Sequence, residues 1–123
     1  MKTITTKNAP AAIGPYSQAK ATDSLLFVSG QIPVDPATGA PAGDTIETQA
    51  EQSMKNVGAI LEAAGSSYEK VLKTTCFLAD MADFAAFNAV YEKYFTGKPA
   101  RSCVAVKDLP KGLLCEVEAI AEL

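Results

Sequence analysis

The stretch Pro99–Val104 places a fixed cation and a thiol two residues apart at the start of an apolar run. If this run forms a strand, Arg101 and Cys103 point to the same face of a sheet. Arginine can bind a planar carboxylate or phosphate through two parallel hydrogen bonds. The alternative is an ion pair between Arg101 and either Glu116 or Glu118 on a neighbouring strand. The two roles are compatible, and the first predicts an anionic ligand.

Proton transfer in this chain has to rely on carboxylates, because the sequence contains no histidine. That absence excludes Ser-His-Asp and Cys-His catalysis. We therefore expect Cys103 to line a pocket rather than to act as a nucleophile. Glu116 and Glu118 are two residues apart on a predicted strand and share a face, where a desolvated carboxylate can act as general acid or base. A solvated strand face is the alternative, and the residues alone do not choose between the two glutamates.

Composition predicts one globular domain over residues 1–123, since 48% of the residues are hydrophobic and 20% are charged. The net charge of -3 argues against a nucleic-acid or anionic-membrane surface. Three widely spaced cysteines fit neither a disulfide framework nor a zinc site, and no metal or cofactor motif is present. The N-terminus has no apolar signal core and no run reaches membrane-spanning length, so we expect a soluble cytoplasmic protein.

Hydrophobic periodicity predicts two helices and five strands. The helices are expected at about 46–64, capped by Asp44 or Thr45 and ended by Gly65, and at about 84–95. The strands are expected at 2–7, 25–30, 71–79, 102–106 and 113–121. The order β-β-α-β-α-β-β favours an α+β fold in which one mixed sheet carries both helices on a single face.

The last predicted strand has two different faces. Its apolar set should face the helices and consists of Leu113, Cys115, Val117, Ala119 and Ala121. The other set mixes Leu114 and Ile120 with carboxylates. A sheet face that is partly apolar and partly charged suits a subunit interface containing a wet site, so we expect an oligomer.

Four further positions are polar groups or glycines beside apolar segments. Tyr16 follows Gly14-Pro15, which makes its backbone rigid. Taken singly, Ser29 suggests a hydroxyl bonded to backbone, Gly30 a strand bend and Asn88 an exposed helix position. None of these positions indicates a ligand by itself.

Together, however, these residues lie in ordered motifs that closely resemble the RidA (YjgF) family of reactive-intermediate imine deaminases, also called the endoribonuclease L-PSP family. The motifs are Ala11–Ala19, Val28–Pro33, Pro99–Val104 with Leu109-Pro110, and Glu116–Ala121. The resemblance covers nearly the whole chain. It implies a chorismate-mutase-like fold and a homotrimer with three sites in the clefts between subunits.

The resemblance also implies a reaction, the hydrolysis of 2-imino acids such as 2-iminopropanoate and 2-iminobutanoate, and of their enamine tautomers, to 2-keto acids and ammonia. Arg101 matches the family arginine that binds the substrate carboxylate, and Glu116 matches the glutamate that positions and activates water. Cys103 matches a cysteine that lines the site. The remaining substrate-binding positions match Tyr16, Ser29, Gly30 and Asn88.

Two other functions remain open. Some relatives are described as endoribonucleases and translation inhibitors, although an acidic chain without histidine is a poor candidate for conventional RNA cleavage. The same pocket would also serve a non-catalytic regulator that binds a small keto or amino acid through Arg101. Many family members carry several more residues before this arginine than Phe95–Lys98 supply here, so we expect the mouth of the cleft, and with it the substrate range, to differ.

Overall fold

A six-stranded sheet in the order β1-β2-β3-β6-β4-β5 organises the chain. The computed structural model describes all 123 residues. The strands are β1 (Lys2–Ile4), β2 (Ala19–Ala21), β3 (Leu25–Gln31), β4 (Val71–Leu78), β5 (Ala100–Ala105) and β6 (Cys115–Glu122). The helices are α1 (Ile46–Ala63) and α2 (Phe84–Tyr94). Only β4 and β5 run parallel, so the sheet is mixed as the sequence predicts.

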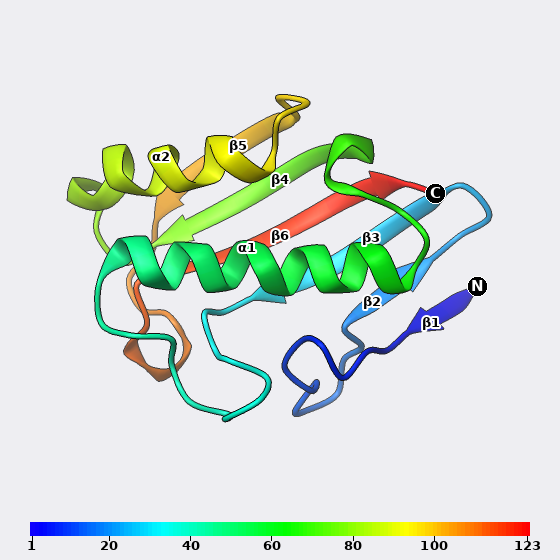
Figure 1. The fold of residues 1–123 in the computed structure, drawn as a ribbon, viewed down its shortest axis with the longest axis horizontal. Helices are drawn as coiled ribbons and strands as arrows, with labels where there is room; N and C mark the ends of the chain where they lie inside the picture. The colour runs from blue at the N-terminus through cyan, green and yellow to red at the C-terminus, as the bar shows by residue number, and fades with distance from the viewer.

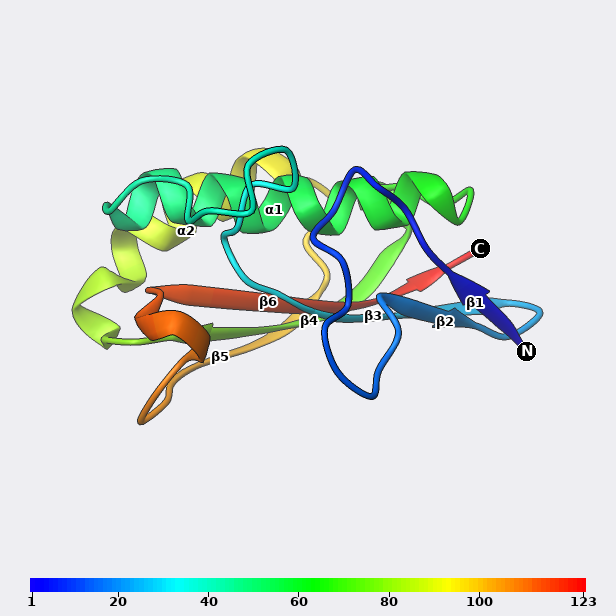
Figure 2. The same ribbon diagram turned by 90° about the horizontal axis from the view of Figure 1, so that it is seen from below.

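Both helices pack on the same face of the sheet (Figure 1). Seen edge-on, α1 and α2 both lie above the strands, and only a short 3-10 turn in the connection between β5 and β6 lies beneath them (Figure 2). The hydrophobic core fills the space between the helices and the sheet, and its fully buried side chains include Leu26, Met54, Ile60, Leu78 and Phe87. The expected α+β class with two helices on one face is therefore confirmed.

Local signals explain where the helices begin and end. The hydroxyl of Thr45 accepts a hydrogen bond from the backbone N–H of Thr48 at 3.2 Å, so Thr45 caps α1. Gly65 follows α1 with φ of 80°, a left-handed conformation that glycine adopts without strain. Asp80 caps a short 3-10 turn before α2 by accepting a hydrogen bond from Ala82 at 2.8 Å.

The strands differ from the sequence prediction in number and in several of their bounds, and the strand predicted at 113–121 spans Cys115–Glu122. The short strand β2 was not predicted, because Ala-Lys-Ala has low intrinsic strand preference and is held by pairing with β1 and β3. The predicted strand 2–7 ends at Ile4. The predicted strand 102–106 begins two residues earlier, which places Arg101 inside β5 rather than before it.

The alternation predicted for the last strand is confirmed. Cys115, Val117, Ala119 and Ala121 are buried beneath the helices, whereas Glu116 and Ile120 on the opposite face are half-buried. Apolar side chains also lie exposed on this opposite face, including Phe27 and Val104. We call it the open face of the sheet. Neither helix has the combination of length and apolar composition needed to cross a bilayer.

Candidate active site

Arg101 and Cys103 point toward the helix layer from β5, the edge strand of the sheet. In the parallel ladder, Arg101 pairs with Thr74 and Cys103 pairs with Cys76. Thr74 and Cys76 are both buried on the helix-covered face, and paired residues of neighbouring strands share a face. The prediction that Arg101 and Cys103 share one face is confirmed. Both are half-buried, as expected at an edge.

Neutral groups of α2 hold the Arg101 side chain. Its Nη1 donates a hydrogen bond to Oδ1 of Asn88 at 2.7 Å. Its Cζ lies 4.7 Å from the ring centroid of Tyr91 and 5.5 Å from that of Phe84. None of these contacts involves a carboxylate, so the guanidinium charge remains available to an anion. Asn88 is thus half-buried and bonded rather than simply an exposed helix residue.

The alternative ion pair between Arg101 and Glu116 or Glu118 is wrong. Strand β4 lies between β5 and β6, so the arginine and the glutamates are not on neighbouring strands. Glu116 pairs with Phe77 and Glu118 pairs with Thr75, one position out of phase with the buried residues of β4. Because side chains alternate along a strand, both carboxylates lie on the open face, opposite Arg101.

Four other predicted site residues do lie together. Tyr16, Ser29, Gly30 and Glu116 line one hollow of about 870 Å³ next to the open face. Two connections border this side of the sheet, the segment before β2 and the segment between β5 and β6, and both extend below the strands in Figure 2. Lys111 and Glu118 also line the hollow.

Gly30 makes room for the Glu116 carboxyl group. A methyl group at Gly30 would lie 2.8 Å from Cδ of Glu116 and closer still to its Oε2. The register between β3 and β6 shifts between Val28 and Gln31, so Gly30 lies at a bulge. The sequence suggested only a bend here, whereas the structure shows that this glycine lets a carboxylate lie against the backbone.

Burial and neighbouring charges shift the pKa values of Glu116 and Cys103. Burial raises the pKa of Glu116, and the neighbouring charge of Glu118 raises it further. A carboxyl group with a raised pKa is better suited to exchange protons near neutral pH. Burial also raises the pKa of the Cys103 thiol, and Arg101 opposes this only in part. The thiol is therefore mainly neutral, in keeping with a lining role.

Buried amide side chains hold the walls of the hollow, and the sequence did not reveal them. Gln18 accepts a hydrogen bond from the backbone of Thr6 at 2.7 Å and donates to the carbonyls of Thr6, Ala9 and Pro10 at 2.8 to 3.3 Å. Asn56 donates to the carbonyls of Ile32 and Val34 at 3.1 and 3.0 Å. The hydroxyl of Ser29 donates to the carbonyl of Ser17 at 2.6 Å, which confirms its predicted backbone bond.

Within one chain, the predicted residues therefore form two groups on opposite faces of the sheet. The Arg101 group contains Arg101, Cys103 and Asn88. The Glu116 group contains Tyr16, Ser29, Gly30 and Glu116. No cluster of three or more histidine, cysteine or acidic side chains that could hold a metal ion is present. The arrangement offers an anion-binding cation in one group and a proton-transfer carboxyl in the other.

Comparisons with known proteins agree with this fold. Residues 6–123 match the family described as Endoribonuclease L-PSP. The 2-iminobutanoate/2-iminopropanoate deaminase of Salmonella typhimurium is 56% identical over 124 residues, covering 98% of this chain and 96% of the relative. A Lactococcus lactis protein that carries the name of a regulator, AldR, is also 56% identical and covers 100% and 98% of the two chains.

Solved structures show the same fold. The YjgF gene product of Escherichia coli superposes with a TM-score of 0.95 at 51% identity, covering 99% of this chain and 98% of that one. Escherichia coli TdcF, crystallised with bound serine, gives a TM-score of 0.95 at 46% identity and covers 100% and 99%. With its fold and nearly its whole length in agreement, the chain belongs to the endoribonuclease L-PSP family, which includes the RidA and YjgF proteins.

Proposed function

We propose that this protein hydrolyses 2-imino acids and their enamine tautomers to 2-keto acids and ammonia, at a site built by two copies of the chain. The observation that carries the proposal is the Arg101 side chain, whose contacts are all with neutral groups. Such an arginine is prepared to receive a small carboxylate. The deaminase names of relatives at 52 to 56% identity support the choice of substrate.

Substrate binding is the role of the Arg101 group. The guanidinium binds the carboxylate of the imino acid through two parallel hydrogen bonds. This contact fixes the position of the adjacent C=N carbon relative to the attacking water. Cys103 provides a neutral wall beside the arginine. Tyr16, Ser29 and Gly30 line the opposite side of the bound substrate when a second copy supplies the Glu116 group.

Proton transfer is the role of Glu116. Its carboxylate takes a proton from a water molecule as the water oxygen forms a bond with the C=N carbon. The same group returns this proton to the nitrogen, which gives a tetrahedral intermediate with one hydroxyl and one amino group. The carboxylate then takes the hydroxyl proton and passes it to the amino nitrogen, so the C=O bond forms as the C–N bond breaks, and ammonia leaves with the 2-keto acid as the other product. The raised pKa of Glu116 supports these transfers, because it makes the carboxylate a stronger base toward the protons that it has to take up.

The two groups meet only if a second copy brings its open face to the edge strand β5 of the first. Exposed apolar side chains on the open face, including Phe27 and Val104, support such an interface. A homotrimer would close this contact into a ring with three equivalent sites, as the family resemblance implies. Sedimentation equilibrium tests this assembly directly, and a monomer at micromolar concentration would contradict it.

The reaction is tested by coupling a pyridoxal-phosphate dehydratase, which releases the imino acid, to this protein. We expect 2-keto acid to appear faster than by spontaneous hydrolysis, and Arg101→Ala to lower kcat/KM about 100-fold through loss of substrate orientation. Lys107→Ala, which removes an exposed cation of the segment after β5, is the matched control and should keep wild-type activity. Equal rates for Arg101→Ala and wild type would refute the scheme.

Mixing two inactive variants tests the shared site. Arg101→Ala and Glu116→Gln damage different groups, so a mixed oligomer contains some sites with both residues intact. With random mixing of equal amounts, about a quarter of the sites are complete, since each partner contributes the intact residue half of the time. Activity that stays at the level of the separate variants after co-refolding would place both residues in a site formed by one chain.

A ligand-binding regulator is the second candidate, favoured by the serine bound to the relative TdcF. The Arg101 group would bind the same class of molecule without turnover. The two functions separate in Glu116→Gln: the enzyme loses turnover and keeps ligand affinity, whereas a regulator shows no turnover before or after the change. RNA cleavage receives no support from the geometry, because carboxylates line the hollow and the chain is acidic.

A further inference from the structure

We infer that Tyr91, fixed by Thr74, is a positioning residue that holds the guanidinium of Arg101 in place while leaving its charge free for the substrate. This inference rests on the proposed anion-binding role of Arg101. Neither Tyr91 nor Thr74 belongs to the predicted site. The spacing of Tyr91 from Phe84, Phe87 and Phe95 places it on the apolar stripe of α2, which accounts for its ring but not for its hydroxyl group.

The geometry forms a closed arrangement of three elements. Thr74 on β4 and Arg101 on β5 are register partners, so their side chains leave the sheet side by side. Tyr91 on α2 covers both, because its hydroxyl oxygen lies 2.7 Å from Oγ1 of Thr74 and its ring centroid lies 4.7 Å from Cζ of Arg101. The hydrogen bond is buried, and Thr74 is only 1% exposed. The tilt of the tyrosine ring is therefore fixed from below.

One face of α2 carries all three side chains that support the Arg101 guanidinium. Phe84, Asn88 and Tyr91 follow one another at steps of four and three residues, which places them along one stripe of the helix. The amide oxygen of Asn88 fixes one edge of the guanidinium, and the guanidinium carbon lies over the rings of Tyr91 and Phe84. Tyr91 also packs against Phe95, with ring centroids 4.6 Å apart.

An aromatic support suits an arginine that has to bind an anion. A carboxylate would hold the guanidinium more strongly, but it would neutralise the charge and occupy the donors that the substrate needs. A ring face attracts the cation through its quadrupole without accepting a directed N–H bond. Tyr91 therefore reduces the freedom of Arg101, and with it the entropy lost on binding, without competing with the ligand.

Arg101 is the only arginine in the chain, which makes a direct test possible. The full-length protein labelled with 15N gives one arginine Nε–Hε signal, and a proton held against a ring face is shifted upfield. In Tyr91→Leu this signal should move toward its ordinary position. The affinity for 2-oxobutanoate, an unreactive product, should fall about 3- to 30-fold, the range expected for loss of a cation–π contact.

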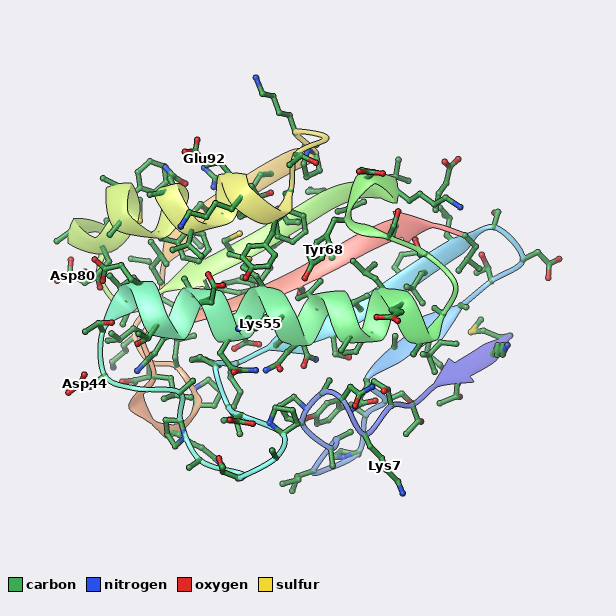
Figure 3. The ribbon with its side chains drawn as sticks, viewed as in Figure 1. Lys7, Asp44, Lys55, Tyr68, Asp80 and Glu92 are labelled. Carbon is green, nitrogen blue, oxygen red and sulfur yellow. The ribbon has the colours of Figure 1, made fainter.

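Control variants separate positioning from simple loss of stability. Tyr68→Leu removes another ring between the helices, and the Tyr68 side chain lies beside α1, to which it bonds through the carbonyl of Met54 (Figure 3). The Tyr68→Leu change should lower the melting temperature but leave the Arg101 signal and the affinity for 2-oxobutanoate unchanged.

Tyr91→Phe keeps the ring and should retain most of the affinity for 2-oxobutanoate. Combining Tyr91→Phe with Thr74→Val removes both buried hydroxyls, so it should recover stability relative to Thr74→Val without restoring the wild-type signal.

Each outcome decides a separate point. If Tyr91→Leu keeps the wild-type signal and affinity, or if Tyr68→Leu lowers the affinity equally, Tyr91 has no positioning role. If wild type binds no 2-oxobutanoate, Arg101 is not an anion site and the inference fails with it. If wild type binds 2-oxobutanoate through Arg101 but hydrolyses no imine, the proposed reaction fails while the positioning role of Tyr91 stands.

Discussion

The Arg101 group and the Glu116 group lie on opposite faces of one sheet, and they differ in the charge of their central side chain and in the elements that support it. Arg101 extends from an edge strand and is supported by a helix through two rings and an amide. Glu116 extends from an inner strand and lies among loops and a glycine, with a second carboxylate nearby. The Arg101 guanidinium makes no ion pair, whereas Glu116 lies in a hollow that is also lined by Glu118 and Lys111.

Within one chain, this separation keeps the Arg101 guanidinium and the Glu116 carboxyl group from forming an ion pair. If Arg101 and Glu116 shared a face and neighbouring strands, they would form an internal ion pair, which would compete with the substrate and lower the pKa of Glu116. The intervening strand β4 and the alternation of side chains prevent that contact. The comparison can be tested by damaging each group by itself, in order of decreasing expected effect.

The largest effect is expected for Glu116→Gln. The amide keeps the shape of the side chain but cannot accept the proton from water, so kcat should fall about 10²- to 10⁴-fold with little change in the affinity for 2-oxobutanoate. Steady-state kinetics and titration calorimetry measure the two quantities. Glu118→Gln on the same strand and face is the matched variant, and it should keep kcat within about threefold. Comparable losses in both variants would contradict the assignment of proton transfer to Glu116 alone.

The next effect is expected for Asn88→Asp, which would place a carboxylate on Arg101. The present hydrogen bond of 2.7 Å would become an ion pair, and the substrate carboxylate would have to compete with it. KM should rise about 10- to 100-fold, corresponding to one charge-assisted hydrogen bond. The thermal stability should be equal or higher.

Asn88→Ala provides the comparison, because it removes the oxygen without adding charge. Its KM should lie between those of wild type and Asn88→Asp. If the alanine variant is the weaker of the two, then the position of Arg101 matters more than its free charge, and the comparison between the two groups has to be revised.

A smaller effect is expected for Gly30→Ala. Its methyl group would overlap the carboxyl of Glu116, and the end of this side chain can move more easily than the backbone. We expect kcat to fall about tenfold as the carboxylate shifts by roughly 1 Å, while the melting temperature changes little. A crystal structure of the variant would show the displacement. Loss of folding without any remaining active fraction would mean that the bulge itself cannot accept a side chain.

The smallest effect is expected for the pH dependence of stability and of the reaction rate. Because burial raises the pKa of Glu116, the folded protein binds this proton more tightly than the unfolded chain does. The resulting stabilisation is complete below the ordinary value of 4.5 and is lost as the pH rises through the folded value. Glu116→Gln should therefore gain stability relative to wild type between pH 4.5 and neutral pH, as measured by urea unfolding. In Glu118→Gln the acidic limb of the pH–rate profile should move to lower pH, because a like charge has been removed.

Sequence patterns were sufficient where one local property decides the outcome. The three- and four-residue periodicity and Thr45 predicted α1, and the alternation along β6 predicted which side chains face the helices. The shared face of Arg101 and Cys103 followed from strand geometry alone. By contrast, β2 exists because of its two neighbours, and nothing in Ala-Lys-Ala indicates it.

Local sequence patterns could not predict the order of the strands in the sheet either. Arg101 and Glu116 were expected on neighbouring strands, but β6 enters the sheet between β3 and β4 and leaves β5 at the edge. The role of Gln18 and Asn56 in holding the walls of the hollow could not be predicted either, because their partners are backbone carbonyls rather than recognisable side chains. The resemblance to a family selected Glu116 over Glu118, and burial together with the contact to Gly30 gives that choice a physical basis.

Gln18 controls how often the segment 6–10, which forms the N-terminal wall of the hollow, can open. Its one side chain makes all four of the bonds that fasten Thr6, Ala9 and Pro10. A single rotation of this amide would therefore break all four bonds at once and leave only the packing of Ala9 against the core to hold the segment, so the segment can open locally at a lower cost than unfolding of the sheet. The amide hydrogen of Thr6 reports such openings, so its exchange rate with solvent measures how often the wall beside Tyr16 detaches.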